Sequence, residues 1–395
     1  MYPPPGSVRA WERPVLRDDG DRHRPTGWIE LFFDLVFVVI VSVLAGNLES
    51  GDSLLDFVLQ FMAVFWAWNA FTYYTERFES HGLENRLFTF VGIVAVAGLA
   101  IWGAHGLGEN YLGFAISYLL ARLLNIGLWL RAGVHVPRFR HAALGFAGGF
   151  VVALALLSAS FFVPQPIRLL LWALAVLVEI LTPLATGRFQ HGLPPVSRDK
   201  FPERFGLLTM IVLGETVAGI IRSVAVVNER HQLTALTMVE AVLALVIGFG
   251  LWWVYFDFVA RRPSRQGIET ILGWVYLHLG MLVGIVAVGA AISEALLQAA
   301  TLGAMMDREV ETLLLAGLGV TLAVIALIEL TLERATDEPT NRVISPLLKI
   351  GAAIVVALAA LIPMSVVVAF CVAVVGLAIQ ASYGAYSYYR RRTAA

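Results

Sequence analysis

The sequence predicts an all-α polytopic membrane protein with about twelve transmembrane helices. Of its 395 residues, 58% are hydrophobic and only 14% are charged, against roughly 45–50% and 25% in soluble domains. The mean hydropathy of +0.77 reflects apolar runs along the whole chain. These observations predict many membrane spans rather than one anchor on a soluble domain.

The spans fall into two sets of six, because a longer polar segment interrupts the apolar runs. The first set covers residues 29–48, 54–75, 86–105, 111–131, 142–162 and 167–187. The second set covers residues 205–222, 235–258, 270–293, 310–332, 346–362 and 364–388. The last boundary lies at Pro363. Between Leu347 and Tyr386 the only charge is Lys349, and this stretch has the roughly 40 residues that two spans need.

The chain is therefore expected to have five segments. They are a disordered cytoplasmic tail (1–27), a first six-helix half (28–187), a cytoplasmic linker (188–204), a second six-helix half (205–388) and a basic cytoplasmic C-terminus (389–395). The tail contains three consecutive prolines and mixed charges, with no apolar core of a signal peptide.

A short sequence that occurs twice suggests that the two halves are parallel repeats. The residues at 92–96, Gly-Ile-Val-Ala-Val, recur at 284–288. We expect duplicated halves of the kind found in transporters. The alternative is that such short apolar segments recur by chance.

The positions of Lys and Arg predict the orientation. With the N-terminus in the cytoplasm, nearly all of the 28 Lys and Arg residues fall on the cytoplasmic side, as the positive-inside rule requires. The outer loops contain only Arg168, Arg222, Arg230 and Arg308. Both termini are therefore expected in the cytoplasm. The net charge of −1 provides no basic field for nucleic acid, so the expected partner is the lipid bilayer.

Ionisable side chains within spans are the candidate functional residues, because each costs at least about 2.5–3.5 kcal/mol at the bilayer centre. Glu30 and Asp34 lie one turn apart in the first span and share one helix face. They repel each other unless a cation lies between them. The alternative is that Glu30 faces water and Asp34 pairs with an arginine.

Three charges lie deeper in the predicted spans, namely Arg122, Glu179 and Glu215. Arg122 is expected to pair with Glu179 or Glu215, and a purely structural salt bridge is the alternative. Together with Glu30 and Asp34, the deep groups are mainly acidic. This balance favours a proton or cation path, although two acids that share a proton would give the same count.

Other polar groups lie nearer the cytoplasmic ends of the spans. His278 suits proton sensing near neutral pH, and a hydrogen-bonded packing residue is the alternative. Asp257 lies at a helix end, where exposure to water is the default. The complete candidate pathway comprises Glu30, Asp34, Asn69, Arg122, Glu179, Glu203, Arg204, Glu215, Asp257 and His278. No cofactor is expected, and the sequence does not identify a metal.

Four segments carry a family likeness: Trp28–Val38, Glu203–Glu215, Trp252–Asp257 and Tyr276–His278. Together they resemble the bacterial low temperature requirement A (LtrA) family of membrane proteins. The family commonly has a histidine where Lys200 lies. The resemblance implies a multi-pass protein, which we expect in the bacterial cytoplasmic (inner) membrane, and it implies no substrate.

Function is therefore inferred from charge placement. The first hypothesis is a secondary transporter or channel-like carrier for an unidentified small solute, ion or lipid. Glu30, Asp34, Glu215 and His278 would handle protons or cations, with Arg122 as counter-ion.

Two alternatives remain. One is a membrane-embedded lipid-modifying enzyme whose inner acids act as acid and base or hold Mg²⁺, although the sequence contains no recognisable catalytic motif. The other is a non-transporting sensor or scaffold. The glycines at 145, 148 and 149 would permit close helix contact within a subunit or in a homo-oligomer.

Overall fold

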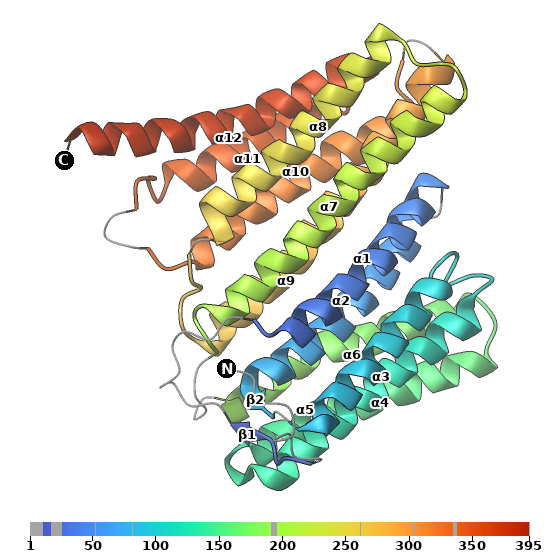
Figure 1. The fold of residues 1–395 in the computed structure, drawn as a ribbon, viewed down its shortest axis with the longest axis vertical. Coiled ribbons are helices and arrows are strands. Elements are labelled where there is room, and N and C mark those ends of the chain that lie inside the picture. The colour runs from blue at the N-terminus through green and yellow to red at the C-terminus, as the bar shows by residue number, and fades with distance from the viewer. Residues whose placement is uncertain are drawn as a thin grey trace. The chain divides into compact units, whose positions relative to one another are not determined.

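The computed structural model describes residues 11–16, 26–51, 53–80, 82–190, 196–260, 262–302, 305–334 and 338–394. Twelve α-helices occupy most of this part of the chain (Figure 1). They are α1 (Trp28–Glu49), α2 (Leu54–Arg77), α3 (Leu83–Ile101), α4 (Tyr111–His135), α5 (Arg140–Ala159), α6 (Ile167–Gln190), α7 (Lys200–Glu229), α8 (Ala235–Tyr255), α9 (Ile268–Leu302), α10 (Arg308–Thr331), α11 (Ile344–Ala359) and α12 (Val366–Ala394). Each predicted span corresponds to one helix, which confirms the all-α fold.

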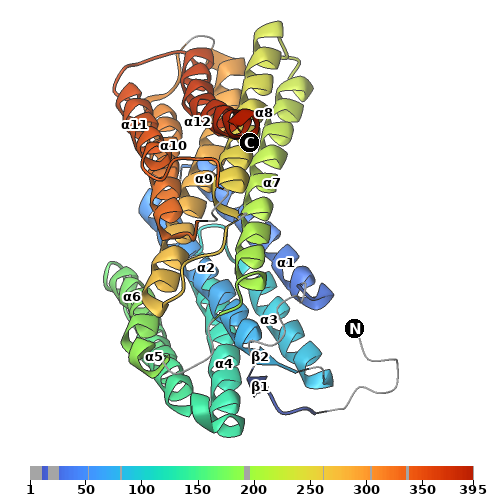
Figure 2. The same cartoon turned by 90° about the vertical axis from the view of Figure 1, so that its left-hand side faces the viewer.

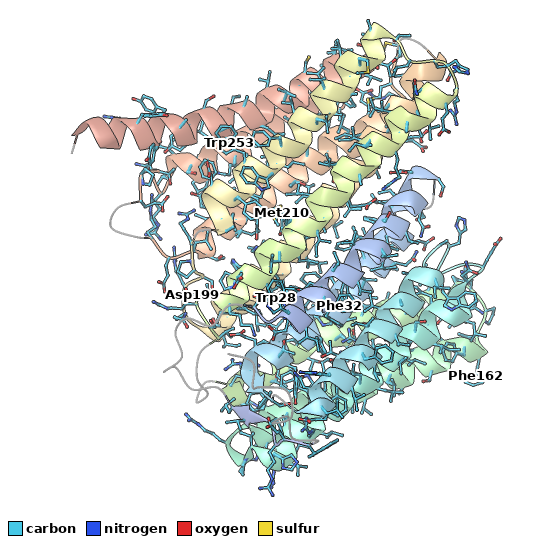
Figure 3. The ribbon with its side chains drawn as sticks, in the orientation of Figure 1. Trp28, Phe32, Phe162, Asp199, Met210 and Trp253 are labelled. Atoms are coloured by element: carbon cyan, nitrogen blue, oxygen red, sulfur yellow. The ribbon has the colours of Figure 1, made fainter. Side chains whose placement is uncertain are left out.

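The helices present apolar outer faces. Eleven of those described are long and apolar enough to cross a membrane, and α11 is a shorter apolar helix. Phe32, Phe162 and Met210 are examples of large side chains that point outwards (Figure 3). Such extensive exposed apolar surface is unusual for a protein in water and suits contact with lipid.

Two compact units share the chain. Unit 1 comprises residues 1–47, 52–204 and 266–272, and unit 2 comprises residues 48–51, 205–265 and 273–395. Helices α2 to α6 and nearly all of α1 therefore belong to unit 1. The first turn of α7 also belongs to unit 1, whereas the rest of α7 and almost all of the later helices belong to unit 2.

In unit 1, α3 packs against α4, α4 against α5, and α5 against α6, while α2 contacts both α4 and α6. Small residues allow the closest of these approaches. Gly149 and Gly145 of α5 face Thr182 and Thr186 of α6, and a Cβ atom at either glycine would collide with the threonine. Aromatic side chains fill the core near one end, where the rings of Trp129 and Phe146 stack with centroids 4.6 Å apart.

In unit 2, α10 packs against α11, α11 against α12, and α12 against α8 (Figure 2). Glycines again mark close contacts, since Gly284 of α9 faces Thr321 of α10 and Gly289 of α9 faces Thr216 of α7. Helix α8 ends in a π-helical turn, Phe256–Ala260. The break between α11 and α12 contains Pro363, as predicted.

Several helix ends differ from the expected segment boundaries. Helix α6 continues to Gln190 and α7 begins at Lys200, so less of 188–204 is linker than expected. The Ser197 hydroxyl accepts a hydrogen bond from the Lys200 amide at 3.1 Å, which supports the early helix start. Within the linker, residues 191–195 lie outside the described residues. Helix α12 includes the basic C-terminus up to Ala394.

Part of the expected disordered tail has a regular conformation. Strand β1 (Val15–Leu16) pairs antiparallel with strand β2 (Phe78–Glu79), which follows α2. The Trp11 ring lies under the Arg131 guanidinium at 4.7 Å. Composition predicted disorder because the tail has consecutive prolines and mixed charges and no apolar core, but these contacts offset the entropy cost of ordering residues 11–16. The remainder of the tail up to residue 25 lies outside the described residues.

Candidate functional site

Two ion pairs join α1 to the first turn of α7. Lys200 Nζ lies 2.8 Å from Glu30 Oε1, and Arg204 Nη2 lies 2.5 Å from Asp34 Oδ1. The two acids are four residues apart on α1 and the two bases are four residues apart on α7, so each pair of like charges shares one helix face. Both acids thus have a cationic partner, which relieves the repulsion that their spacing predicts.

Glu30 also fixes the start of α1. Its Oε2 atom accepts a hydrogen bond from the Gly27 amide at 2.9 Å. This is one half of a capping box, in which an acid three residues into the helix satisfies a free amide at its start. The position of Glu30 opposite Lys200 is therefore set by local helix geometry as well as by charge.

Helix α2 completes the surroundings of the second pair. Trp68 Nε1 donates to Asp34 Oδ1 at 2.8 Å, and Arg204 Nη2 donates to Thr72 Oγ1 at 3.2 Å. Asp34 and Arg204 are each only 1% exposed. Two opposite full charges are thus enclosed with neutral polar groups from a third helix.

The hydrogen bonding of this pair is incomplete. Asp34 Oδ2 and the Nε and Nη1 atoms of Arg204 are buried and have no hydrogen-bond partner in the described structure. Unsatisfied buried polar atoms cost about 1–3 kcal/mol each, and more when charged. One acceptor, Asp34 Oδ2, and two donors, Arg204 Nε and Nη1, are therefore left without a partner among the described residues.

A second buried pair lies between α4 and α6. Arg122 Nη2 lies 2.7 Å from Glu179 Oε2 and donates to the Tyr118 hydroxyl at 2.5 Å. The Tyr118 hydroxyl in turn donates to the same Glu179 oxygen. The predicted pairing of Arg122 with Glu179 is confirmed. Arg122 Nε and Glu179 Oε1 are buried without partners, so this pair is also incomplete.

Asn69 and Glu203 lie on the same helices as the α1–α7 pairs but have different surroundings. Asn69 is half-buried on α2, and its Oδ1 atom has no hydrogen-bond partner among the described residues. Glu203 is exposed on α7. The structure therefore does not bring Glu203 into the pairs made by Lys200 and Arg204.

Glu215 in unit 2 has a partner on its own helix. Its carboxylate pairs with Arg222, two turns further along α7. Glu215 is 7% exposed, whereas the Arg222 side chain is 54% exposed. Of the two partners expected for Arg122, the structure shows Glu179, and Glu215 pairs with Arg222 instead.

His278 is enclosed by aromatic residues of unit 2. Its Nδ1 atom lies 2.8 Å from the Trp274 carbonyl oxygen, and its Nε2 atom lies 3.3 Å from the Tyr255 hydroxyl. The geometry suits a neutral ring in which Nδ1–H donates to the carbonyl and Nε2 accepts from the hydroxyl. Both ring nitrogens have partners, which favours the packing alternative.

Asp257 is exposed in the π-helical turn after α8. Its Oδ2 atom accepts a hydrogen bond from Trp253 Nε1, one turn earlier at the end of α8, at 2.6 Å. This exposure agrees with the default expected for an acid at a helix end.

A buried cluster in unit 2 was not predicted. Glu329 Oε1 of α10 lies 3.1 Å from Arg262 Nη2 in an ion pair. Its Oε2 atom accepts hydrogen bonds from Lys349 at 3.0 Å and from Ser345 at 2.9 Å. The Lys349 ammonium also lies 3.5 Å from the centroid of the Phe258 ring. Glu329 and Lys349 occupy the ends of predicted spans, and Arg262 lies in the loop between two of them, where the sequence alone favours exposure to water.

Lys200 was also missed, because it falls within the predicted linker. One signal was available: Lys200 and Arg204 have the same four-residue spacing as Glu30 and Asp34. Matching spacings on two helices allow two parallel ion pairs.

The pairs change the charge balance expected from the sequence. Glu30, Asp34, Glu179 and Glu215 each contact a basic side chain, so the expected acidic surplus does not hold. Within the described part of the chain, no group of three or more His, Cys, Asp or Glu residues is placed to hold a metal ion.

The long helices expose apolar faces that suit contact with lipid, and buried charges are neutralised in pairs between helices. These features define a polytopic α-helical integral membrane protein that is surrounded by the lipid bilayer. The family model described as bacterial low temperature requirement A protein (LtrA) matches residues 26–379. The chain belongs to this family.

An uncharacterized protein of Rhizobium meliloti (strain 1021) is 24% identical to the chain over 292 residues, which cover 68% of this chain and 67% of that protein. No solved structure matches the chain.

Proposed function

We propose that the protein is a secondary transporter in which Asp34 takes up and releases a proton and Arg204 is its counter-ion. The incomplete hydrogen bonding of this buried pair carries the proposal. A pair that serves only packing gains stability when all its polar atoms are bonded. Both Glu329 oxygens contact a polar or basic side chain, whereas Asp34 Oδ2 and Arg204 Nε and Nη1 have no hydrogen-bond partner among the described residues.

The charges favour proton handling over metal-cation handling. Glu30, Asp34, Lys200 and Arg204 form two neutral pairs. A metal cation that approached Asp34 would meet the permanent positive charge of Arg204, which cannot lose its proton. A proton can instead bind to the carboxylate itself, and such intramembrane acids serve as proton relays in transporters.

The proposed pathway is confined to unit 1. It includes the Glu30–Lys200 pair, one turn nearer the start of both helices than Asp34 and Arg204. It also includes the Tyr118, Arg122 and Glu179 group, which has free polar atoms of its own. Asn69 belongs to the same proposal because of its free buried oxygen.

Four predicted residues are not retained in the pathway. They are the exposed acids at 203 and 257, the helix-paired Glu215 and the hydrogen-bonded His278.

The packing within each unit supports a duplicated transporter. Contacts of α4 with α5, α5 with α6 and α2 with α6 have counterparts six helices later, in contacts of α10 with α11, α11 with α12 and α8 with α12. Parallel repeats of this kind are a feature of transporters with two similar halves. We place this transporter in the bacterial cytoplasmic membrane with both termini in the cytoplasm, on the distribution of Lys and Arg.

Proteoliposomes test the proposal. The purified protein is reconstituted with a pH dye inside, and proton movement is followed after addition of monovalent and divalent ions, amines, amino acids or phospholipids. We expect at least one solute to drive proton movement, and we expect Asp34→Asn to abolish it.

Asp199→Asn is the matched control, because Asp199 is an exposed acid just before α7 (Figure 3) and asparagine also caps helices well. Asp199→Asn should behave as the unchanged protein. Solute-driven proton movement that survives in Asp34→Asn would reject the role of Asp34. If no solute moves protons, the scaffold hypothesis replaces the transporter.

A further inference from the structure

The charge of the Asp34–Arg204 pair can change in only one way. Arginine keeps its proton in proteins, so protonation of Asp34 is the only available change. Glu30 on α1 also acts electrostatically on Asp34, and Glu30 is itself paired with Lys200 on α7 at 2.8 Å. From α2 the pair receives only the neutral groups of Trp68 and Thr72.

Burial makes the net charge of this site decisive. Asp34 and Arg204 are each 1% exposed, and a buried charge without a partner is strongly unfavourable. A proton bound to Asp34 alone would leave Arg204 uncompensated. An anion bound to Arg204 alone would leave a net negative site, whereas a proton and a monovalent anion together keep the site neutral.

We propose that the Asp34–Arg204 pair binds a small monovalent anion together with one proton. A proton from the aqueous phase binds to the Asp34 carboxylate, and the contact between Asp34 Oδ1 and Arg204 Nη2 opens. The anion then accepts hydrogen bonds from the guanidinium, whose Nε and Nη1 atoms are already free. The positive charge that enters with the proton equals the negative charge that enters with the anion.

The same reasoning excludes other ligand charges at this pair. A cation would add positive charge next to Arg204, whose guanidinium cannot lose its proton. A divalent anion would need a second proton, and Glu30, the acid that also acts on Asp34, already pairs with Lys200. That the anion is a substrate of transport rests on the proposed function. Its binding together with a proton can be measured without transport.

Proton uptake on anion binding tests the proposal. The full-length protein in detergent and weak buffer receives the sodium salts of chloride, nitrate, acetate or phosphate, while a pH indicator measures proton uptake and calorimetry measures binding. We expect about one proton per bound monovalent anion. Because one proton is linked to one anion, the Kd should fall about tenfold for each unit by which pH is lowered, above the pH at which Asp34 titrates.

Variants separate the two binding events. Asp34→Asn should bind the same anion without proton uptake and without pH dependence, because asparagine leaves Arg204 without its negative partner. Arg204→Gln should not bind the anion. The double variant Asp34→Asn with Arg204→Gln is a neutral pair that should fold and should not bind, and Asp199→Asn should match the unchanged protein.

Three results would overturn the proposal. They are anion binding to the unchanged protein without proton uptake, anion binding that persists in Arg204→Gln, and the absence of binding of all four anions to the folded protein. Proton-linked binding without flux in proteoliposomes would reject the transporter while the binding proposal stands. Solute-driven proton flux that requires no anion would support the transporter and reject the binding proposal.

Discussion

Asp34 and Glu329 are both buried carboxylates with basic partners, yet their surroundings differ. Glu329 Oε1 forms an ion pair with Arg262, and Glu329 Oε2 accepts hydrogen bonds from Ser345 and Lys349. Only one oxygen of Asp34 has a partner. A complete network contributes to packing, whereas an incomplete one can bind something further. We therefore assign the Glu329 cluster to stability and the Asp34 pair to function.

Replacement of Lys349 tests the structural role of the Glu329 cluster. Lys349→Met removes the ammonium from a fully buried position and leaves Glu329 with fewer compensating contacts. Loss of one partner of a buried pair costs about 3–5 kcal/mol, so the thermal unfolding temperature in detergent should fall clearly. Arg342→Met, at an exposed position shortly before α11, is the control and should change it little. Equal unfolding temperatures for the two variants would contradict the structural role.

The sequence predicted part of the site at this scale. The shared face of Glu30 and Asp34 follows from helix geometry, and Arg122 was a basic residue deep enough to meet Glu179. Pairing between distant helices was harder to predict, because the partner depends on tertiary packing. Lys200 was assigned to a linker for that reason, and the burial of Lys349 was not foreseen.

At the scale of elements, apolar length was enough to predict every helix, because a span must satisfy its backbone hydrogen bonds internally. Helix ends were less predictable. Helix α7 begins within a polar segment because Ser197 and the pairs made by Lys200 and Arg204 stabilise its first turn. Strand β1 depends on pairing with β2, and Trp11 on its contact with Arg131 of α4, neither of which the tail composition reveals.

The packing of α5 against α6 gives a prediction with a matched control. Gly149→Ala places a methyl group against Thr182, whose branched side chain has little freedom in a helix. The two helices must separate, so the unfolding temperature should fall. At Gly148 a Cβ atom would meet nothing within 4 Å, and Gly148→Ala should be neutral or slightly stabilising because alanine favours helices.

A second substitution checks the cause of this effect. Thr182→Ala in the Gly149→Ala background removes the side chain that the new methyl group meets, and it should recover part of the lost stability. Equal unfolding temperatures for Gly149→Ala and Gly148→Ala would show that α5 and α6 do not pack closely at this position.

At the scale of the whole molecule, the side on which the chain ends depends on α11. This helix has 16 residues, and at about 1.5 Å per residue it extends roughly 24 Å. A typical hydrocarbon core is about 30 Å thick, although a bilayer can thin around a short helix. If α11 crosses, twelve spans place both termini on one side, and if it does not, eleven spans place them on opposite sides.

Reporter fusions to the two termini distinguish these arrangements. We expect green fluorescent protein at either end to fluoresce, and alkaline phosphatase at either end to be inactive, because both termini are predicted in the cytoplasm. An active phosphatase at the C-terminus alone would show that α11 does not cross the membrane. The sequence predicted two spans between Leu347 and Tyr386 from the length of this stretch. The fusions show whether the stretch crosses the membrane twice.

The double variant Asp34→Asn with Arg204→Gln shows whether Asp34 and Arg204 act in transport rather than only in packing. It replaces a neutral ion pair with a neutral hydrogen-bonding pair and leaves no buried charge uncompensated. We predict an unfolding temperature closer to that of the unchanged protein than either single variant shows, together with complete loss of solute-driven proton flux in proteoliposomes. A double variant that keeps this flux would contradict the account and assign the pair to structure.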